Sequence, residues 1–453
     1  MQLVAYGAQD IYLTGNPQIT FFKVVYRRHT NFALESIEQT FNGNPGFGKR
    51  VTCTISRNGD LIHKTYLRVQ LPQITVSAGA GATNGFRWLD WIGHLLVKTV
   101  EIEIGGQRID KHYGEWLQIW NELTQTSGHA LGYANMVGNT PALTSVTKAT
   151  NGTAIVPAKT LYVPLQFWFC RNPGLALPLI ALQYHEIKIN LEFRDLKDCY
   201  WSGTSTNGGT TWTNTATDVP DFGASLYVDY VYLDTEERRR YAQVAHEFLI
   251  DQLQFTGDEC TGSISNKLKL NFNHPTKELI WVVQKQDYIT DGSADIATNA
   301  GKQWFNWTDT WSTKPTAIGA ANLIDGEADG AIGAFGVIGP VGSNPVSIAR
   351  LQLNGHDRTA DRDGDYYNLV QPYQHHTNIP SVGINVYSFA LRPEEHQPSG
   401  TCNMSRIDSA VLNMTLRQSA ISTTNGQVNV KVFALNYNVL RIMSGMGGLA
   451  YAN

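Results

Sequence analysis

The feature that most constrains the fold of this chain is a two-residue alternation of apolar and polar side chains. It occurs at residues 51–55 (VTCTI), 100–104 (VEIEI), 187–191 (IKINL) and 428–432 (VNVKV). Successive side chains of a β-strand point to opposite faces, so each segment is expected to place its apolar side chains on one face and its polar side chains on the other. Clusters of Gly, Asn, Pro and Ser, as at residues 42–46 and 202–217, separate the strands. Many short strands with turn residues between them predict an all-β sandwich fold.

Two segments carry helix signals. Residues 113–123 have apolar side chains at helical spacing, and residues 235–242 place two acids before three arginines, an order that stabilises a helix. The second segment lies near the middle of the chain. Because 453 residues exceed what one hydrophobic core usually serves, two domains are expected, and this helix is a candidate link between them.

Three pairs of similar segments occur in the same order in both halves of the chain. They are residues 102–106 and 351–355, 167–173 and 387–393, and 226–233 and 433–440. Duplication explains the shared order better than chance does. The sequence therefore predicts two similar β domains, one over residues 1–235 with an N-terminal arm, and one over residues 236–453. Residues 127–159 and 291–345 have weak periodicity and are expected to form long surface loops.

Charge is scarce in this chain. Charged residues make up 16% and the net charge is −4, whereas about a quarter is typical of soluble domains. Such a composition indicates a surface largely covered by other copies of the chain. The densest basic run, at residues 238–240, follows two glutamates and fits a solvated helix face better than a phosphate clamp. We therefore expect no direct binding to nucleic acid.

The cysteines and the apolar runs indicate the compartment. The five cysteines (Cys53, Cys170, Cys199, Cys260 and Cys402) form no CxxC pair and no zinc spacing with histidine, so we expect buried, reduced thiols, as in cytosol. The first residues lack a basic region, so no signal peptide is expected. No run approaches the about 18 apolar residues of a membrane span.

Two motifs resemble ligand sites and fail on inspection. Residues 43–50 (GNPGFGKR) match a phosphate-binding loop except at Arg50, where magnesium binding needs Ser or Thr, and a strand pattern follows. Residues 361–365 (DRDGD) begin like a calcium loop, but Tyr366 and Pro372 stand where Gly and Glu are required. We interpret both segments as turns.

The histidines give no stronger signal. His375 and His376 would point to opposite faces of a strand and could not chelate together, and His185 is expected to be a hydrogen-bonded core residue. The segment at His246 lacks the second histidine of a zinc protease motif. We therefore predict no catalytic site, no metal site and no cofactor.

Four Asn-X-Ser/Thr sequons are candidate glycosylation sites, at Asn151, Asn306, Asn403 and Asn413. Asn151 and Asn306 lie in the two expected long loops and should be exposed. Asn413 alternates with Leu412 and Met414 and should face outward from its strand. Without a route into the secretory pathway, the simplest interpretation of these sequons is coincidence.

Several long segments resemble one family throughout the chain. They include residues 7–22 (GAQDIYLTGNPQITFF), 173–186 (PGLALPLIALQYHE), 398–403 (PSGTCN) and 436–453 (NYNVLRIMSGMGGLAYAN). Together these segments are similar to the major capsid proteins of nucleocytoplasmic large DNA viruses, most closely those of the algal phycodnavirus branch.

This resemblance implies a double jelly roll of two eight-stranded sandwiches without catalytic residues. It further implies homotrimers that look hexagonal and tile an icosahedral shell above an internal membrane, with penton protein at the vertices and minor capsid proteins beneath. Synthesis and assembly would take place in the host cytoplasm. The segment before Phe21 would be an arm under the capsomer. Some members are glycosylated outside the secretory pathway, which makes Asn306 and Asn403 the best candidate sites.

Two other functions remain open from the residues alone. A β-sandwich lectin or carbohydrate-active enzyme would fit the many Trp and Tyr residues, but it would need paired carboxylates facing one cleft. A minor capsid role, such as a penton or scaffold protein, is the second alternative.

Overall fold

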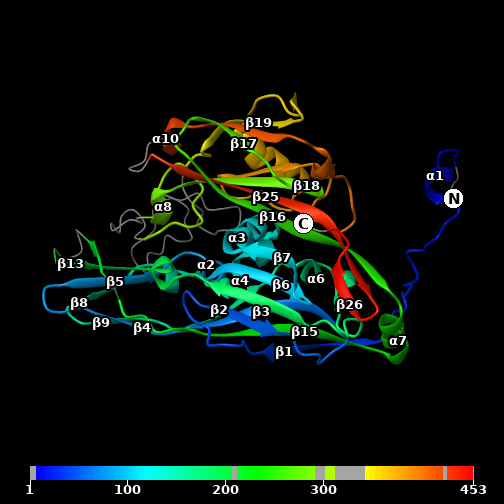
Figure 1. Ribbon diagram of the computed structural model, residues 1–453, viewed down its shortest axis with the longest axis horizontal. Helices are drawn as coiled ribbons and strands as arrows, with labels where there is room; N and C mark the ends of the chain where they lie inside the picture. Colours follow the sequence, from blue (N-terminus) through cyan, green and yellow to red (C-terminus); the bar gives the residue numbers. More distant parts are fainter. Residues whose placement is uncertain are drawn as a thin grey trace, which may run out of the picture.

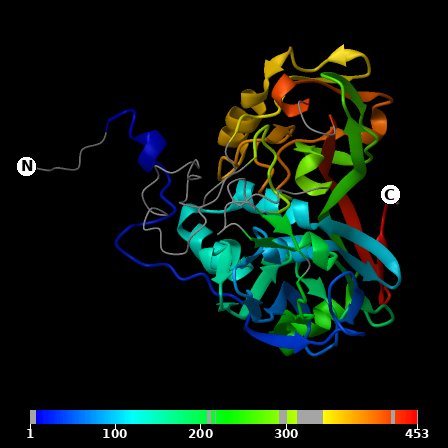
Figure 2. The ribbon, with the colours of Figure 1, turned by 90° about the vertical axis from the view of Figure 1, so that its left-hand side faces the viewer.

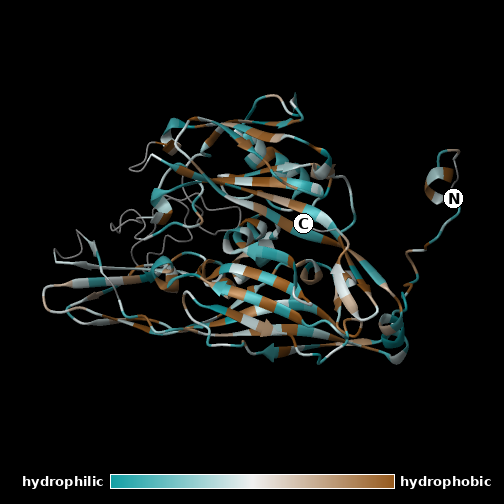
Figure 3. Ribbon diagram, in the orientation of Figure 1, coloured by the Kyte–Doolittle hydropathy of each residue, from teal (hydrophilic) through white to brown (hydrophobic). Residues whose placement is uncertain are grey.

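The computed structural model describes residues 7–206, 212–215, 217–290, 301–311, 342–421 and 426–451. Two antiparallel β-sandwiches lie one above the other, and the chain passes between them through α7 (Thr235–Gln243) (Figure 1). We call them the first roll and the second roll. Figure 3 shows the apolar and polar residues alternating along their strands. The predicted all-β fold and double jelly roll are confirmed.

The first roll consists of two facing sheets. One has the strand order β1 (Phe32–Gln39), β15 (Gly223–Leu233), β3 (Leu61–Leu71) and β10 (Lys159–Pro164), and β11 (Leu177–Pro178) also pairs with β3. The other has the order β2 (Arg50–Thr54), β12 (Ile187–Phe193), β6 (Val97–Ile104) and β7 (Gln107–Tyr113). Their apolar faces meet in a core that includes Leu67, Val228, Ile102 and Ile189.

The second roll repeats this order strand by strand. Its first sheet runs β16 (His246–Thr261), β25 (Val428–Met443), β18 (Pro275–Lys285) and β22 (Ile384–Ser388), with β23 (Cys402–Asn403) beside β18 and β26 (Met446–Leu449) beside β25. Its second sheet runs β17 (Ser265–Lys269), β24 (Ala410–Leu416), β19 (Val346–Leu353) and β20 (His356–Asp357), with β21 (Arg362–Asp363) also on β19. The shared order supports the predicted duplication.

The repeated segments occupy equivalent places in the two rolls. Gly105 and Gly106 turn β6 into β7, and Asn354 and Gly355 turn β19 into β20, all four with positive φ, as a two-residue type I′ hairpin requires. The segments at residues 226–233 and 433–440 lie on the equivalent strands β15 and β25. Their residue-by-residue match is wrong, however, because Leu226 lies in the core of its own roll whereas Phe433 faces the other roll. A shift of one residue exchanges the two faces of a strand.

Both predicted helices are present. The first is α3 (Gly114–Thr124), and the second, α7, begins where the Asp234 carboxylate accepts a hydrogen bond from the backbone N–H of Glu237 at 3.0 Å. Further short helices include α1 (Ile11–Thr14), α2 (Ile92–Leu96), α6 (Trp168–Arg171), α8 (Asp287–Thr290), α9 (Gln371–His375) and α10 (Gln418–Ile421).

The expectation of one long loop over residues 127–159 is wrong. This segment forms α4 (Ser127–Val137), α5 (Pro141–Thr144), β8 (Thr147–Thr150) and β9 (Thr153–Val156). β8 joins β5 (Thr83–Trp88), β13 (Tyr200–Ser205) and β14 (Thr213–Asn214) in one sheet, and β9 pairs with β4 (Ile74–Ser77). Together these strands form an extension on one side of the first roll, at the left of Figure 1. Of residues 291–345, only 301–311 and 342–345 lie within the described ranges.

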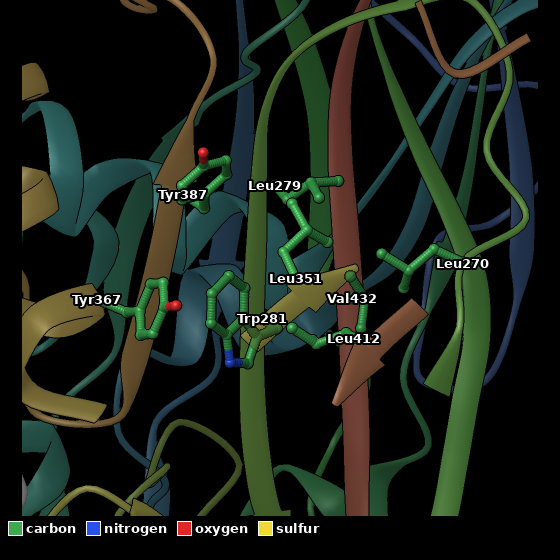
Figure 4. Close-up of a pocket in the computed structure, with 8 residues that line it drawn as sticks. All are labelled: Leu270, Leu279, Trp281, Leu351, Tyr367, Tyr387, Leu412 and Val432. Atoms are coloured by element: carbon green, nitrogen blue, oxygen red, sulfur yellow. The ribbon is translucent and has the colours of Figure 1, made fainter. Parts of the chain in front are cut away.

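The second roll has a closely packed core of its own. Figure 4 shows eight of its side chains, and the gaps among them leave no room for a water molecule. They are Leu270, Leu279, Trp281, Leu351, Tyr367, Tyr387, Leu412 and Val432. This region is therefore a packed interior and holds no ligand pocket.

Three of the five cysteines are buried as predicted, but Cys260 is exposed and Cys402 is half-buried. Burial raises the pKa of both Cys53 and Cys170 to about 11, so these two thiols stay protonated at neutral pH. All five cysteines are free thiols.

Candidate functional site

The two rolls pack against each other along one interface. The sheet made of β16, β25, β18 and β22 lies between the core of the second roll and the top of the first (Figure 1). Along β18, Leu279, Trp281 and Val283 face the second roll's core, whereas Ile280 and Val282 face the first roll. A sheet that is buried on both faces carries apolar side chains on both faces, as β18 does.

Aromatic rings fill the centre of this interface. The rings of Trp116 on α3 and Phe433 on β25 lie 5.7 Å apart, and Phe255 on β16 stacks on Phe433 at 4.8 Å. Tyr113, at the end of β7, meets Phe255 edge-on at 5.0 Å. Aromatic pairs of this kind contribute about 0.5–1.5 kcal/mol beyond their burial. α3 is therefore buried between the rolls.

Buried charges form a bridge beside these rings. The Glu115 carboxylate on α3 lies 3.0 Å from the Arg194 guanidinium and 3.5 Å from the Lys431 ammonium of the second roll. Burial alone would raise the pKa of Glu115, but Lys431 and Arg194 lower it to about 2. Lys431 lies on the polar face of residues 428–432 and is nonetheless only 5% exposed, because that face is covered by the first roll.

A second buried cluster joins the rolls through Asp251 on β16. Its carboxylate lies 3.0 Å from the Lys277 ammonium and 3.8 Å from the Arg171 guanidinium of the first roll. Nearby, the carboxylate of Asp110 accepts a hydrogen bond from the backbone N–H of Leu253 at 3.1 Å. Since the Arg171–Asp251 and Asp110–Leu253 contacts each join one roll to the other, they set the position of one roll on the other.

His376 occupies an unexpected environment. It follows α9 instead of lying on a strand, and its fully buried ring lies between two carboxylates. Nε2 is 2.9 Å from Glu278 and Nδ1 is 2.9 Å from Glu394. Burial by itself would lower the pKa of His376, but Glu278 and Glu394 raise it to about 9. The imidazole is therefore charged at neutral pH, and His375 contacts the carbonyl of Leu391 instead.

The four sequons lie on separate elements, and the structure does not bring them together. Asn151 is exposed in the turn between β8 and β9, and Asn403 is exposed on β23. Asn413 is half-buried on the polar side of β24, where Leu412 and Met414 point into the core, as predicted.

The expectation that Asn306 is exposed is wrong. Its side chain is 3% exposed. The amide nitrogen donates to Gln303 Oε1 at 2.5 Å and to the carbonyl of Thr310 at 3.0 Å, and Oδ1 accepts from the backbone and hydroxyl of Thr308. Glycosylation would break these buried hydrogen bonds.

The segments that resemble ligand sites are structural. Residues 43–50 connect β1 and β2 without opening a helix, and Lys49 pairs with Asp221 at 2.8 Å. Asp361 pairs with Arg350 at 3.5 Å. Across the described ranges, no three His, Cys, Asp or Glu side chains are placed to hold a metal ion. His185 is only half-buried and contacts Gly447 at 3.0 Å, so its predicted core position is wrong.

The N-terminal segment extends away from both rolls (Figures 1 and 2). Its apolar side chains are exposed, and Tyr12, Phe21 and Phe22 are 90%, 91% and 98% accessible. Apolar exposure on this scale is typical of a surface that a partner covers. Among the described helices, none is long and apolar enough to cross a membrane.

Comparisons with known proteins cover nearly the whole chain. Residues 20–234 match the model of the major capsid protein N-terminus, and residues 237–448 match the large eukaryotic DNA virus major capsid protein. The major capsid protein of Pyramimonas orientalis virus is 54% identical over 100% of this chain and 99% of its own length. That of Phaeocystis pouchetii virus is 53% identical, with the same coverage of both chains.

Two solved structures of capsid proteins resemble this chain. The PBCV-1 VP54 crystal structure, fitted into a reconstruction of the virophage Sputnik, is 37% identical with a TM-score of 0.72 and covers 96% of this chain and 100% of its own. The Faustovirus major capsid protein is 15% identical with a TM-score of 0.73, covers 97% of this chain and 94% of its own, and so shares the fold.

The sequence analysis did not predict the buried ion pairs between the rolls, because the partners in each pair are far apart in sequence.

Replacing Lys431 tests the buried bridge. Lys431→Met should lower the free energy of unfolding by about 1–3 kcal/mol, since Glu115 keeps Arg194 but loses its second buried partner where water cannot replace it. Arg441→Met is the matched control, because Arg441 lies on β25 like Lys431 but its pair with Glu247 at 2.8 Å is half exposed, and such pairs contribute at most about 1 kcal/mol. Urea titration measures the free energy of unfolding of both variants. Equal losses in the two variants would contradict a stabilising role for the buried Glu115–Lys431 ion pair.

His376 predicts a pH dependence of stability. Its pKa rises from 6.5 to about 9 on folding, so its contribution should be complete below pH 6.5 and be lost as the pH rises through 9. His376→Gln should therefore destabilise strongly at about pH 6 and much less at about pH 10, as measured by urea unfolding. A difference between the two proteins that stays constant with pH would rule out the charged imidazole.

Proposed function

The chain belongs to the family of large eukaryotic DNA virus major capsid proteins, and from that premise we propose that three copies assemble into one capsomer of six jelly rolls. It is a structural subunit of a virus capsid and not an enzyme. The observation that carries the proposal is the interface between the rolls, where two equivalent sandwiches already pack side by side. A ring of six such units needs three chains.

The domain boundary follows from the same architecture. We place the first domain at residues 1–235, including the N-terminal arm, and the second at residues 236–453. In the described part of the chain, every strand pairing stays within one of these two ranges. The family matches end and begin at residues 234 and 237, next to this boundary.

The shell implies further partners. Neighbouring capsomers, penton protein at the vertices and minor capsid proteins would contact the subunit, and assembly would take place in host cytoplasm above an inner membrane that the protein does not enter. The exposed apolar arm at residues 7–31 is the surface we assign to contacts beneath the capsomer. The low charge of the chain agrees with a role that does not contact the genome.

Among the sequons, exposure favours Asn403 and Asn151 as glycosylation sites. Asn403 Oδ1 accepts a hydrogen bond from the backbone of Ser405 at 3.1 Å, and Asn151 Oδ1 accepts from Gly81 at 2.8 Å. Both residues stay accessible at the surface of the single chain. Asn413 is half-buried, and the buried amide of Asn306 makes that residue the poorest acceptor of the four.

The native mass tests the capsomer. One chain has a mass of 50.2 kDa, so light scattering coupled to size-exclusion chromatography should give three times this value, and the trimer should survive dilution because the contact is apolar. A stable monomer at micromolar concentration would contradict the trimer. It would also favour the alternative that the protein is a β-sandwich lectin or carbohydrate-active enzyme.

Peptide mass spectrometry of the protein from purified virions tests the sequons. Peptides with Asn403 or Asn151 should carry sugar mass, and the peptide with Asn306 should be unmodified because that side chain is buried. The Asn306 peptide is the internal control for non-specific modification. Sugar on Asn306, or bare peptides at both Asn403 and Asn151, would refute this assignment.

A further inference from the structure

The N-terminal arm at residues 7–31 exposes apolar side chains that nothing in the described part of the chain covers. Every residue from 11 to 31 is exposed, and Phe22, Val24, Val25 and Tyr26 are 98%, 72%, 73% and 85% accessible. Residues 17–31 form neither helix nor strand. An apolar segment of this kind indicates a surface that a partner covers.

The same stretch carries positive charge with no negative charge beside it. Lys23, Arg27 and Arg28 lie among the apolar side chains, and no Asp or Glu occurs from residue 11 to residue 34. The whole chain, by contrast, has a net charge of −4. Within the described ranges, none of the three cations has an ion-pair partner. The arm therefore presents free cations to an anionic partner.

The arm leaves the first roll beside α7 and projects into solvent. Phe32, the first residue of β1, pairs with Leu233, and α7 begins two residues later at Thr235. α7 carries three arginines and two glutamates, so most of the net positive charge of this region lies on the arm. In both views the arm runs clear of the two rolls (Figures 1 and 2), which leaves its length accessible to an extended surface.

The composition of the arm favours a lipid surface over a nucleic acid. Single-stranded nucleic acids bind to aromatic rings that stack on the bases and to grooves lined with many cations. Here only three cations accompany aliphatic side chains such as Ile19, Val24 and Val25, which have no ring to stack. The interface of a bilayer accepts aliphatic and aromatic side chains alike, and its anionic headgroups attract Lys and Arg.

We propose that the arm binds the surface of an anionic lipid bilayer, with Lys23, Arg27 and Arg28 against the headgroups and the apolar side chains at the same depth. The arm stays at this depth, because the hydrocarbon offers no hydrogen-bond partners to a backbone without helix or strand. This inference rests on the proposed capsomer, in which the three arms of one trimer bind the same bilayer together and gain avidity.

Co-sedimentation of the purified full-length protein with lipid vesicles tests this assignment. Vesicles of phosphatidylcholine and phosphatidylserine in equal parts should bind the protein about 100-fold more tightly than vesicles of phosphatidylcholine alone, since each basic residue near an anionic surface contributes about fivefold. Lys23→Gln with Arg27→Gln and Arg28→Gln should remove this preference. Phe21→Ser with Phe22→Ser should weaken binding to the mixed vesicles at least about tenfold, because two exposed rings no longer leave water.

Lys267→Gln with Lys269→Gln and Arg417→Gln is the matched control. It removes the same amount of charge from exposed positions of the second roll, away from the arm. This variant should bind the mixed vesicles as tightly as the wild type does. Circular dichroism and light scattering should give every variant the fold and the mass of the wild type.

Several results would overturn the lipid assignment. They are a wild-type protein that does not bind the mixed vesicles, equal affinity for the two kinds of vesicle, an equal loss of affinity in the control, or tighter binding of the arm to single-stranded DNA. A wild-type protein that is monomeric in light scattering would instead overturn the proposed capsomer, whatever its affinity for vesicles. The two failures are therefore distinct.

Discussion

The structure depends on a single sheet that is buried on both faces. The strands β16, β25, β18 and β22 close the core of the second roll with one face and cover the first roll with the other. An apolar sheet in this position cannot be left in water, because about 25 cal/mol is lost for each square ångström of apolar surface exposed. The second roll is therefore not independent of the first, and the two sandwiches behave as one structural unit.

Apolar contact alone would let the rolls slide, and the buried charges prevent this. Glu115 can be ionised in the interior only while Arg194 and Lys431 remain within a few ångströms. Asp251 requires Lys277 and Arg171 in the same way. Displacing one roll would separate Lys431 from Glu115 and Arg171 from Asp251, the two ion pairs of these clusters that join the rolls. A fixed angle between the rolls is what a shell subunit needs if identical copies are to tile.

The duplicated architecture also explains how the exposed surfaces arise. Each roll has a face that covers and a face that is covered, but one chain can join only one such pair. The sheet beside β1 and the helical segment at Leu369 and Tyr373 are the two surfaces left over. Exposed strand edges and apolar patches favour uncontrolled association unless a partner covers them.

The sequence by itself determined the strand class, because a two-residue alternation is local and buries one face whatever lies opposite. It also determined the duplication, the helices α3 and α7, and the family, whose segments run the length of the chain. Only the tertiary structure decided that Asn306 is buried, that Lys431 lies in an interface and that His376 lies between two carboxylates. Burial and ionisation are set by neighbours in space, and the partners of Lys431 and His376 come from strands and helices far away in sequence.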